Sequence, residues 1–497
     1  MANLRRRVVR GGALLILSRV LTQVFVWAAT LLIARFLTPL DYGLMAIGLL
    51  VVGLADVFSE AGIGRALIQK ETLERRDVDE GFTLNLVLAI AIYAGLFFLA
   101  DPLAVYVFDA PDLPTFLRVL GLHVLLVPFM AVPLALLDRD LSMGKQSAIH
   151  AGTALLQSSL VLALAIAGMG YWSLVAGSLA RRLLEVICYI AGSGWRPRLV
   201  SLSYRVRGLV RFGIHVSMGT FLWYLYSNLD YAFVANLAGT VQVGFYALAF
   251  QLISLPAEKM TALINKIAYP TFCRLQNDRA RLHDWFVRLL VLVGFLGMPV
   301  VVGMALVAPD GLVVALGEKW ADAVLPFQLL SLSGLIRIYS GLYPMVFNAL
   351  GRPDLNFKMS LVCVIFLPAC YYVGGQVGFY QAGEAGAVIG VCLVWMICFP
   401  LVVMGLIHLT RNVTSVGLKE LFWSQRAILA VTLFMAALVS AVQWSLPELP
   451  RLARLLLAIG VGVVAYAGPM LLFCRRTVLA DLWLLWRELK GNPKTDV

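Results

Sequence analysis

The sequence predicts an all-α membrane protein that crosses the bilayer fourteen times. Of its 497 residues, 61% are hydrophobic and only 14% are charged, whereas a soluble domain has about 25% charged residues. The apolar residues form continuous runs of about 20 residues, the length that spans a bilayer as a helix. They do not alternate with polar residues, which excludes a transmembrane β-barrel. These observations also exclude soluble, collagen-like and disordered chains.

The predicted spans follow one another with short connections. They cover residues 11–36, 43–63, 81–100, 115–137, 149–169, 171–192, 213–237, 245–265, 286–306, 326–350, 355–377, 383–409, 426–444 and 452–473. The longest outer connection, 307–325, is too short to fold as a domain, and no nucleotide-binding or metalloprotease motif occurs. The chain therefore has to act through its helices.

The basic residues orient the predicted helices. Lysine and arginine are concentrated in every second connection and at both ends of the chain, whereas the opposite connections contain only Lys319 and Arg451. Basic connections stay on the cytoplasmic side, so we expect both termini to be cytoplasmic. The net charge of +12 is explained by this topology, and we expect no nucleic-acid partner. The seven cysteines contain no C-x-x-C pair, so we expect neither a metal site nor a cofactor.

Two turns of the sequence resemble each other. Residues 34–43 (ARFLTPLDYG) follow the first span, and residues 235–244 (ANLAGTVQVG) follow the seventh, 201 residues later. Six helices separate the turns, so the two halves have the same orientation, as in transporters built from parallel repeats. We therefore predict two pseudo-symmetric six-helix lobes, 1–200 and 201–412. Two additional helices over 413–476 and a cytoplasmic amphipathic tail over 477–497 follow them.

Five short motifs occur in a characteristic order along the chain. They are the run Ile33–Leu44, residues 244–249, residues 269–272, residues 317–320 and residues 351–355. In order and spacing they resemble the polysaccharide-transport (Wzx-like) flippases of the multidrug/oligosaccharidyl-lipid/polysaccharide (MOP) superfamily. The first motif resembles the opening of these proteins, the next two the start of their second half, and the resemblance covers residues 11–360.

The resemblance implies a flippase of the bacterial inner membrane. Such a protein moves undecaprenyl-pyrophosphate-linked oligosaccharide from the inner to the outer leaflet by alternating access of two lobes. The oligosaccharide serves the synthesis of O-antigen, capsule or exopolysaccharide. The expected partners are this lipid-linked oligosaccharide, the membrane lipids, a coupling ion (H⁺ or Na⁺), and the machinery for polysaccharide polymerisation and export.

Arginines inside the predicted spans are candidate substrate-binding residues, because a charge at mid-bilayer costs about 3 kcal/mol. Arg19, Arg181, Arg182 and Arg337 are placed in this way, and Gln23 follows Arg19 one turn later on the same face. A guanidinium offers a planar fork of donors that fits phosphate oxygens and keeps its charge. We expect these residues to line a cationic cavity that binds the pyrophosphate.

The acidic residues in the spans leave an alternative open. Asp56, Glu185 and Asp230 could pair with the arginines as buried structural ion pairs. Asp56 and Asp230 could instead carry the coupling ion, because a carboxylate in a low-dielectric site can take up a proton near neutral pH.

Two other functions stay open at this point. A multidrug cation antiporter of the same superfamily needs an acidic cavity, whereas the deepest charges here are largely arginines. A membrane-embedded glycosyltransferase or polymerase needs a sizeable outer loop or paired catalytic carboxylates. The connection 307–325 carries Asp310, Glu318 and Asp322 without such spacing. The sequence therefore favours a transporter that is not an enzyme.

Overall fold

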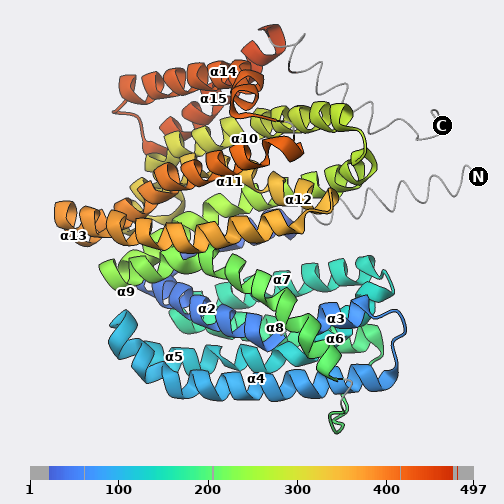
Figure 1. The fold of residues 1–497 in the computed structure, drawn as a ribbon. Coiled ribbons are helices and arrows are strands. Elements are labelled where there is room, and N and C mark those ends of the chain that lie inside the picture. Colours follow the sequence, from blue (N-terminus) through green and yellow to red (C-terminus); the bar gives the residue numbers. More distant parts are fainter. Residues whose placement is uncertain (1–21, 61, 204–205, 415, 474–477, 479–497) are drawn as a thin grey trace, which may run out of the picture. The chain divides into compact units, whose positions relative to one another are not determined.

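The computed structural model describes residues 22–60, 62–203, 206–414, 416–473 and 478. All regular structure in these residues is helical (Figure 1). Within them, ten helical stretches are long and apolar enough to cross a bilayer, and a shorter apolar helix covers Thr22–Phe36. The chain is therefore a multi-span membrane protein. It divides into two compact units, unit 1 (Met1–Gly244) and unit 2 (Phe245–Val497).

The helices of unit 1 pack as antiparallel neighbours. After Thr22–Phe36 come α2 (Pro39–Glu60), α3 (Ile63–Gln69), α4 (Arg75–Leu103) with a π-helical extension (Ala104–Phe108), α5 (Leu113–Leu120), α6 (Leu122–Arg139), α7 (Met143–Ile166), α8 (Tyr171–Ser193) and the first part of α9 (Val206–Leu275). An apolar core joins α3, α4 and α6 through Ile63, Leu67, Phe82 and Val132. At one end of this core, the guanidinium of Arg139 donates to backbone carbonyls of residues 67–71.

The residues that carry the family resemblance start α2. Thr38 precedes the helix, and its backbone N–H and hydroxyl both donate to the carboxylate of Asp41 at 2.7 Å. The backbone N–H of Asp41 in turn lies 3.3 Å from the Thr38 hydroxyl. This reciprocal cap satisfies donors that the first turn leaves free, and Pro39 fits the first helical position because it has no N–H to satisfy. The motif is therefore a helix start, followed by Gly43.

The two turns that resemble each other contact each other in unit 1. A Cβ atom on Gly43 would overlap the backbone carbonyl of Thr240, and a Cβ atom on Gly244 would overlap that of Pro39. Gly43 and Gly244 are equivalent in the repeat, as are Pro39 and Thr240, so the two contacts exchange under a local two-fold axis. Next to this contact, α9 bends at Gly239 (φ 79°).

Unit 2 contains the rest of α9 and six further α-helices among its described residues. They are α10 (Arg279–Leu316), α11 (Val324–Ser340), α12 (Leu342–Ala349), α13 (Pro353–Thr414), α14 (Leu418–Ser445) and α15 (Arg451–Phe473), with a 3₁₀ helix (Glu318–Ala323) before α11. The pair α14–α15 packs on α10 through Met435, Val439 and Ala458. Arg454 fixes the start of α15 by an ion pair with the buried Asp310 of α10.

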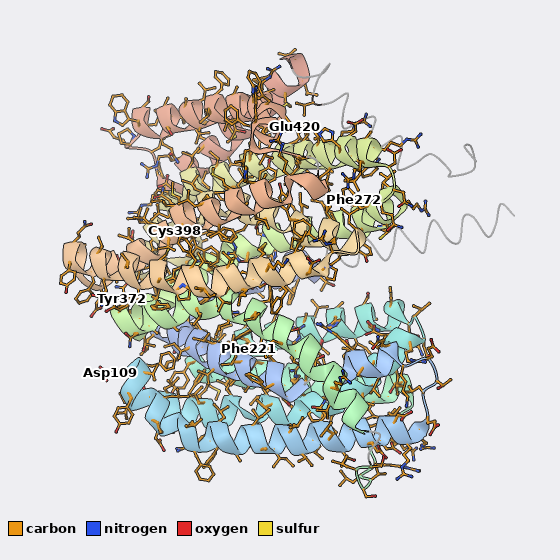
Figure 2. All side chains as sticks on the ribbon, viewed as in Figure 1. Asp109, Phe221, Phe272, Tyr372, Cys398 and Glu420 are labelled. Atoms are coloured by element: carbon orange, nitrogen blue, oxygen red, sulfur yellow. The ribbon has the colours of Figure 1, made fainter. Side chains whose placement is uncertain are left out.

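Helix α13 is a hairpin of two arms. The backbone leaves the helical conformation at Ala382 and Gly383, where Gly383 has a φ of 64°. Below this tip the arms touch through two glycine pairs, Gly374–Gly390 and Gly378–Gly386, in which each Cβ position meets the backbone of the other arm. Glycines four residues apart on both arms permit this approach, as in the G-x-x-x-G contacts of membrane helices. Figure 2 labels Tyr372 on the first arm and Cys398 on the second.

The observed helices overlap the predicted spans but do not confirm that there are fourteen. Ten stretches of the described residues are long and apolar enough to cross a bilayer, and α8, over the predicted span 171–192, is not one of them. One predicted connection also differs. The connection predicted over 307–325 is mostly helical, because α10 continues to Leu316 and the 3₁₀ helix follows at once. Helical hydrogen bonding needs no apolar side chains, so the helix outlasts the apolar run that predicted it. Residues 1–21, which include 11–21 of the first predicted span, lie outside the described residues, as does the predicted tail 477–497 apart from residue 478.

Candidate functional site

Arg337 of α11 lies in unit 2 against two neighbouring aromatic rings, whose centroids are 6.2 Å apart. Its guanidinium carbon is 4.2 Å from the ring centroid of Phe250 on α9 and 5.0 Å from that of Trp395 on α13. The indole N–H of Trp395 donates to the Tyr246 hydroxyl at 3.0 Å, which fixes the Trp395 ring. A cation held over an aromatic face gains about 0.5–2 kcal/mol, with the higher values in sites shielded from water.

The rings hold the Arg337 guanidinium without neutralising it. Among the described residues, Arg337 makes no ion pair, although its side chain is half-buried. An aromatic ring contacts the flat face of a guanidinium, whereas the N–H donors lie at the edge of the guanidinium and can still donate to another group. The guanidinium can therefore bind an anion such as a phosphate group through its donor fork.

The second in-span arginine, Arg182 of α8, is paired. Its Nη2 lies 3.1 Å from Oδ2 of Asp56 on α2, and Nδ1 of His123 on α6 lies 3.2 Å from the same oxygen. The side chains of Arg182 and Asp56 are 14% and 24% exposed. Oδ1 of Asp56 and Nε of Arg182 are buried without a partner among the described residues. The pair therefore compensates its charge but leaves one acceptor and one donor for a further polar group.

Arg181, the neighbour of Arg182, belongs to another network. Its Nε donates to Glu185 at 3.0 Å and its Nη1 donates to Gln157 of α7 at 3.0 Å. His150 contacts Glu185 at 3.3 Å and the hydroxyl of Tyr189 at 3.0 Å. These bonds join α7 to α8. The two adjacent arginines are thus used on different faces of α8.

The other predicted site residues are separate from these clusters. Arg19 lies outside the described residues. Gln23 lies, half-buried, on the apolar helix Thr22–Phe36. Asp230 is fully buried on α9, and one of its carboxylate oxygens accepts the backbone N–H of Tyr231 at 3.0 Å. The structure therefore brings Asp56 and Arg182 together and places Arg337 with aromatic partners.

Sequence reasoning did not identify Phe250, Trp395 and His123 as site residues. Each is an ordinary residue of an apolar or mixed helix, and each lies more than 50 residues from the charged group that it contacts. A charged residue in an apolar run can be recognised in the sequence, because its burial costs free energy. Its aromatic or histidine partners have no such feature.

The fold and its long apolar helices define a polytopic helical membrane protein. A solved structure titled "Lipid II flippase MurJ, inward closed conformation" has the same fold, with a TM-score of 0.71 and 11% identity over 96% of this chain and 100% of that chain. A family model described as "Polysaccharide biosynthesis protein" matches residues 32–325, more than half of the sequence. The chain belongs to this family.

Two curated relatives are similar to most of the chain. The lipopolysaccharide biosynthesis protein WzxC of Escherichia coli (strain K12) is 28% identical over 73% of this chain and 74% of its own length. The succinoglycan biosynthesis transport protein ExoT of Rhizobium meliloti (strain 1021) is 25% identical over 92% of this chain and 91% of its own.

Proposed function

We propose that this protein moves an oligosaccharide linked to undecaprenyl pyrophosphate from the inner to the outer leaflet of the bacterial inner membrane. The names of WzxC and ExoT concern lipopolysaccharide and succinoglycan synthesis, which supports a role in the assembly of a surface polysaccharide. In this proposal the chain forms fourteen transmembrane helices, with both termini cytoplasmic. Two six-helix lobes, 1–200 and 201–412, alternate in access, and the helices of 413–476 are an addition to them.

The observation that carries the proposal is the uncompensated guanidinium of Arg337. A transporter for an anionic head group needs a cation that stays available in the membrane, and the aromatic walls of Phe250 and Trp395 keep this cation in place. A cationic drug would be repelled at the same position, which disfavours a multidrug cation antiporter. Arg19, Gln23, Arg181 and Arg182 complete the proposed binding residues. To bind the substrate, Arg181 would have to release the carboxylate of Glu185 and Arg182 that of Asp56, and each would then bind phosphate oxygens.

Ion coupling is a separate part of the proposal. Asp56 shares one oxygen between Arg182 and His123, so an approaching pyrophosphate that takes Arg182 would leave the carboxylate free to accept H⁺ or Na⁺. Asp230, fully buried on α9, is the second candidate. Transport that is insensitive to both pH and Na⁺ gradients would contradict this part and leave the flippase itself untouched.

The test is a flipping assay in proteoliposomes with a short fluorescent oligosaccharide on undecaprenyl pyrophosphate. We expect Arg337→Ala to reduce the initial rate by about tenfold or more, which corresponds to the loss of one charge-assisted bond of about 1.5–3 kcal/mol. Arg337→Lys keeps the charge but loses the planar stacking, and we expect an intermediate rate.

The matched control is Arg426→Ala. Arg426 also stacks on an aromatic ring, 4.8 Å from the centroid of Trp423, but it is exposed on α14, outside the proposed lobes. We expect this variant to transport at the wild-type rate. Equal rates for Arg337→Ala and Arg426→Ala, with both proteins monodisperse, would contradict the role of Arg337. Wild-type protein that does not flip the lipid at all would contradict the proposed function.

A further inference from the structure

The two arms of α13 enclose an apolar groove on their exposed side. The groove has a volume of about 520 Å³, and the glycines of the two backbone contacts form its floor. Its rims include Val373, Val377 and Ile397, which are 59%, 51% and 57% exposed. The groove exists because glycines bring the backbones together and place no side chain above the contact, while the flanking positions carry branched side chains.

The dimensions of the groove fit a single hydrocarbon chain. Its lining extends from Ala369 to Gln381 on the first arm, a rise of about 18 Å at 1.5 Å per residue. A volume of about 520 Å³ over this length gives a mean cross-section of about 29 Å², or a width of about 6 Å. A file of methylene groups, with contact distances of about 4 Å, fits this width.

The groove has a polar end and an apolar end. The polar end lies at the hairpin tip, beside Gln381 and Tyr380, whose side chain is 85% exposed. Exposed tyrosines at such a position sit at the level of the lipid head groups. The other end, at Ala369 and Cys398, lies inside an apolar stretch long enough to span the membrane.

The length of the groove selects among lipid chains. Its depth of about 18 Å is close to half the hydrocarbon thickness of a bilayer, about 15 Å, so it accommodates a chain that spans one leaflet. The polyprenyl chain of the proposed substrate is much longer than one leaflet is thick. The groove and the Arg337 site also use different faces of the second arm, because Val394 lines the groove while the adjacent Trp395 contacts Arg337.

We propose that the α13 groove binds one acyl chain of a membrane phospholipid, with the head group beside the hairpin tip. The chain fills the space above the glycine contacts and packs against the rim residues of both arms. It is thereby a component of unit 2, distinct from the transported lipid, and its binding does not depend on the proposed function.

A photoactivatable phospholipid tests the proposal. Its diazirine is placed at the end of one acyl chain, and the full-length protein is reconstituted in vesicles of phosphatidylethanolamine and phosphatidylglycerol without any saccharide. We expect the label to concentrate at the deep end of the groove, on peptides that contain Ala369–Cys370 and Ile397–Cys398. Label spread evenly over the lipid-exposed faces of the described helices would overturn the proposal.

Variants that fill the groove provide the second readout. Val377→Trp and Val373→Trp each place an indole in it, and we expect either variant to lower labelling of these peptides about tenfold. Ile365→Trp is the matched control, because Ile365 is 68% exposed on the same arm but does not line the groove. Unchanged labelling in both groove variants would overturn the proposal.

Two competing occupants have their own measurements. The first measurement uses a polyprenyl phosphate with a terminal diazirine. If this probe labels the deep end more strongly than the phospholipid does, the groove binds the substrate chain and the proposal is overturned. The second measurement uses Ile397→Cys in an otherwise cysteine-free chain. If two copies of this variant form a disulfide, the groove is an interface with a second copy of the protein and the proposal is overturned. Because none of these measurements requires transport, their outcome is independent of the flipping assay.

Discussion

Two arginines of the predicted spans, Arg182 and Arg337, differ in the partners that the fold gives them. Arg182 is paired with Asp56 and is charge-compensated, whereas Arg337 is held by Phe250 and Trp395 and keeps its charge available. The alternative of structural ion pairs therefore describes the geometry of Arg182, and of Arg181 with Glu185. The geometry of Arg337 suits an anion-binding role.

The Asp56–Arg182 pair should be more sensitive to the loss of one partner than of both. Asp56→Asn or Arg182→Gln leaves a largely buried charge without its counter-charge, and we expect each to lower the free energy of unfolding by about 1–3 kcal/mol. The double variant has no unpaired charge and should be less destabilised than the sum of the two. Thermal unfolding of the purified protein in detergent measures all three.

The exposed pair Arg352–Asp354, with atoms 2.9 Å apart, is the control for this experiment. Water screens such a pair, so we expect Asp354→Asn to leave the melting temperature unchanged. If the losses in free energy of unfolding of the two single variants add up to that of the double variant, the side chains of Asp56 and Arg182 do not interact.

At the residue scale, sequence reasoning found the charges but not their surroundings. Arg182 and Arg337 stand out in the sequence because arginine is costly in a bilayer. Phe250 and Trp395 do not stand out, because aromatic residues are common in membrane helices and only the packing of α9, α11 and α13 brings them to Arg337. The aromatic site therefore required the tertiary structure.

At the scale of the helix, close backbone contacts are made by glycines that the sequence supplies in pairs. Gly43 and Gly244 join α2 to α9, and Gly374–Gly390 and Gly378–Gly386 join the arms of α13. The apolar runs 355–377 and 383–409 predicted two helices with a short connection, and the two arms of α13 meet at Ala382 and Gly383. Run length did not predict that the backbones of the two arms touch, because that contact depends on the glycine pairs.

The contact between α2 and α9 should not tolerate a single methyl group. We expect Gly43→Ala and Gly244→Ala each to lower the free energy of unfolding by about 1–3 kcal/mol, because the new Cβ atom meets a backbone carbonyl that cannot rotate away. The effects of the two substitutions should not add, since both disrupt the same pair of turns. Melting temperatures of the single and double variants test this.

Gly95→Ala supplies the comparison. Gly95 lies within α4, and its Cβ position has no neighbouring atom within 4 Å. Alanine is the better helix former by about 1 kcal/mol, so this variant should be as stable as the wild type or more stable. A Gly43→Ala protein that matches Gly95→Ala in melting temperature would contradict the described contact.

On the scale of the whole molecule, basic charge, apolar run length and the repeated turn predicted a multi-span helical transporter with internal symmetry. The sequence carried less information about the attachment of α14 and α15. Their contacts to α10 rest on pairs distant in the chain, such as Arg454 with Asp310 and Gln443 with the carbonyl of Leu306.

A pH-sensitive ion pair also joins α14 to α10. His283 lies in the polar first turns of α10, ahead of its apolar run, and its Nε2 is 2.7 Å from Oε1 of Glu420 at the start of α14 (Figure 2). Partial burial acts to lower the pKa of His283, but hydrogen bonds to Glu420 and Asp284 outweigh it and raise the pKa above its usual 6.5. The folded protein therefore favours the protonated imidazole.

The stabilisation from this pair should be present at acidic pH and lost as the pH rises. A raised pKa in the folded state means full stabilisation below about pH 6.5 and none once the pH exceeds the folded-state pKa. We expect His283→Gln to lower the melting temperature at pH 6 and to have no effect at pH 9. The difference should correspond to about 1 kcal/mol or less, because the pair is partly exposed.

Glu420→Gln should weaken the same pH dependence, since it removes one of the two carboxylates that raise the pKa of His283. If the difference in melting temperature between the wild type and His283→Gln grows as the pH rises, the assigned direction of the pKa shift is wrong.

The reciprocal contact of Gly43 and Gly244 also restricts how the two halves of this chain can diverge. In a duplicated gene each copy ordinarily accumulates changes on its own. Here each glycine faces the backbone of the other copy, so a larger residue accepted in one half displaces the turn of the other. Selection on either turn is then selection on both.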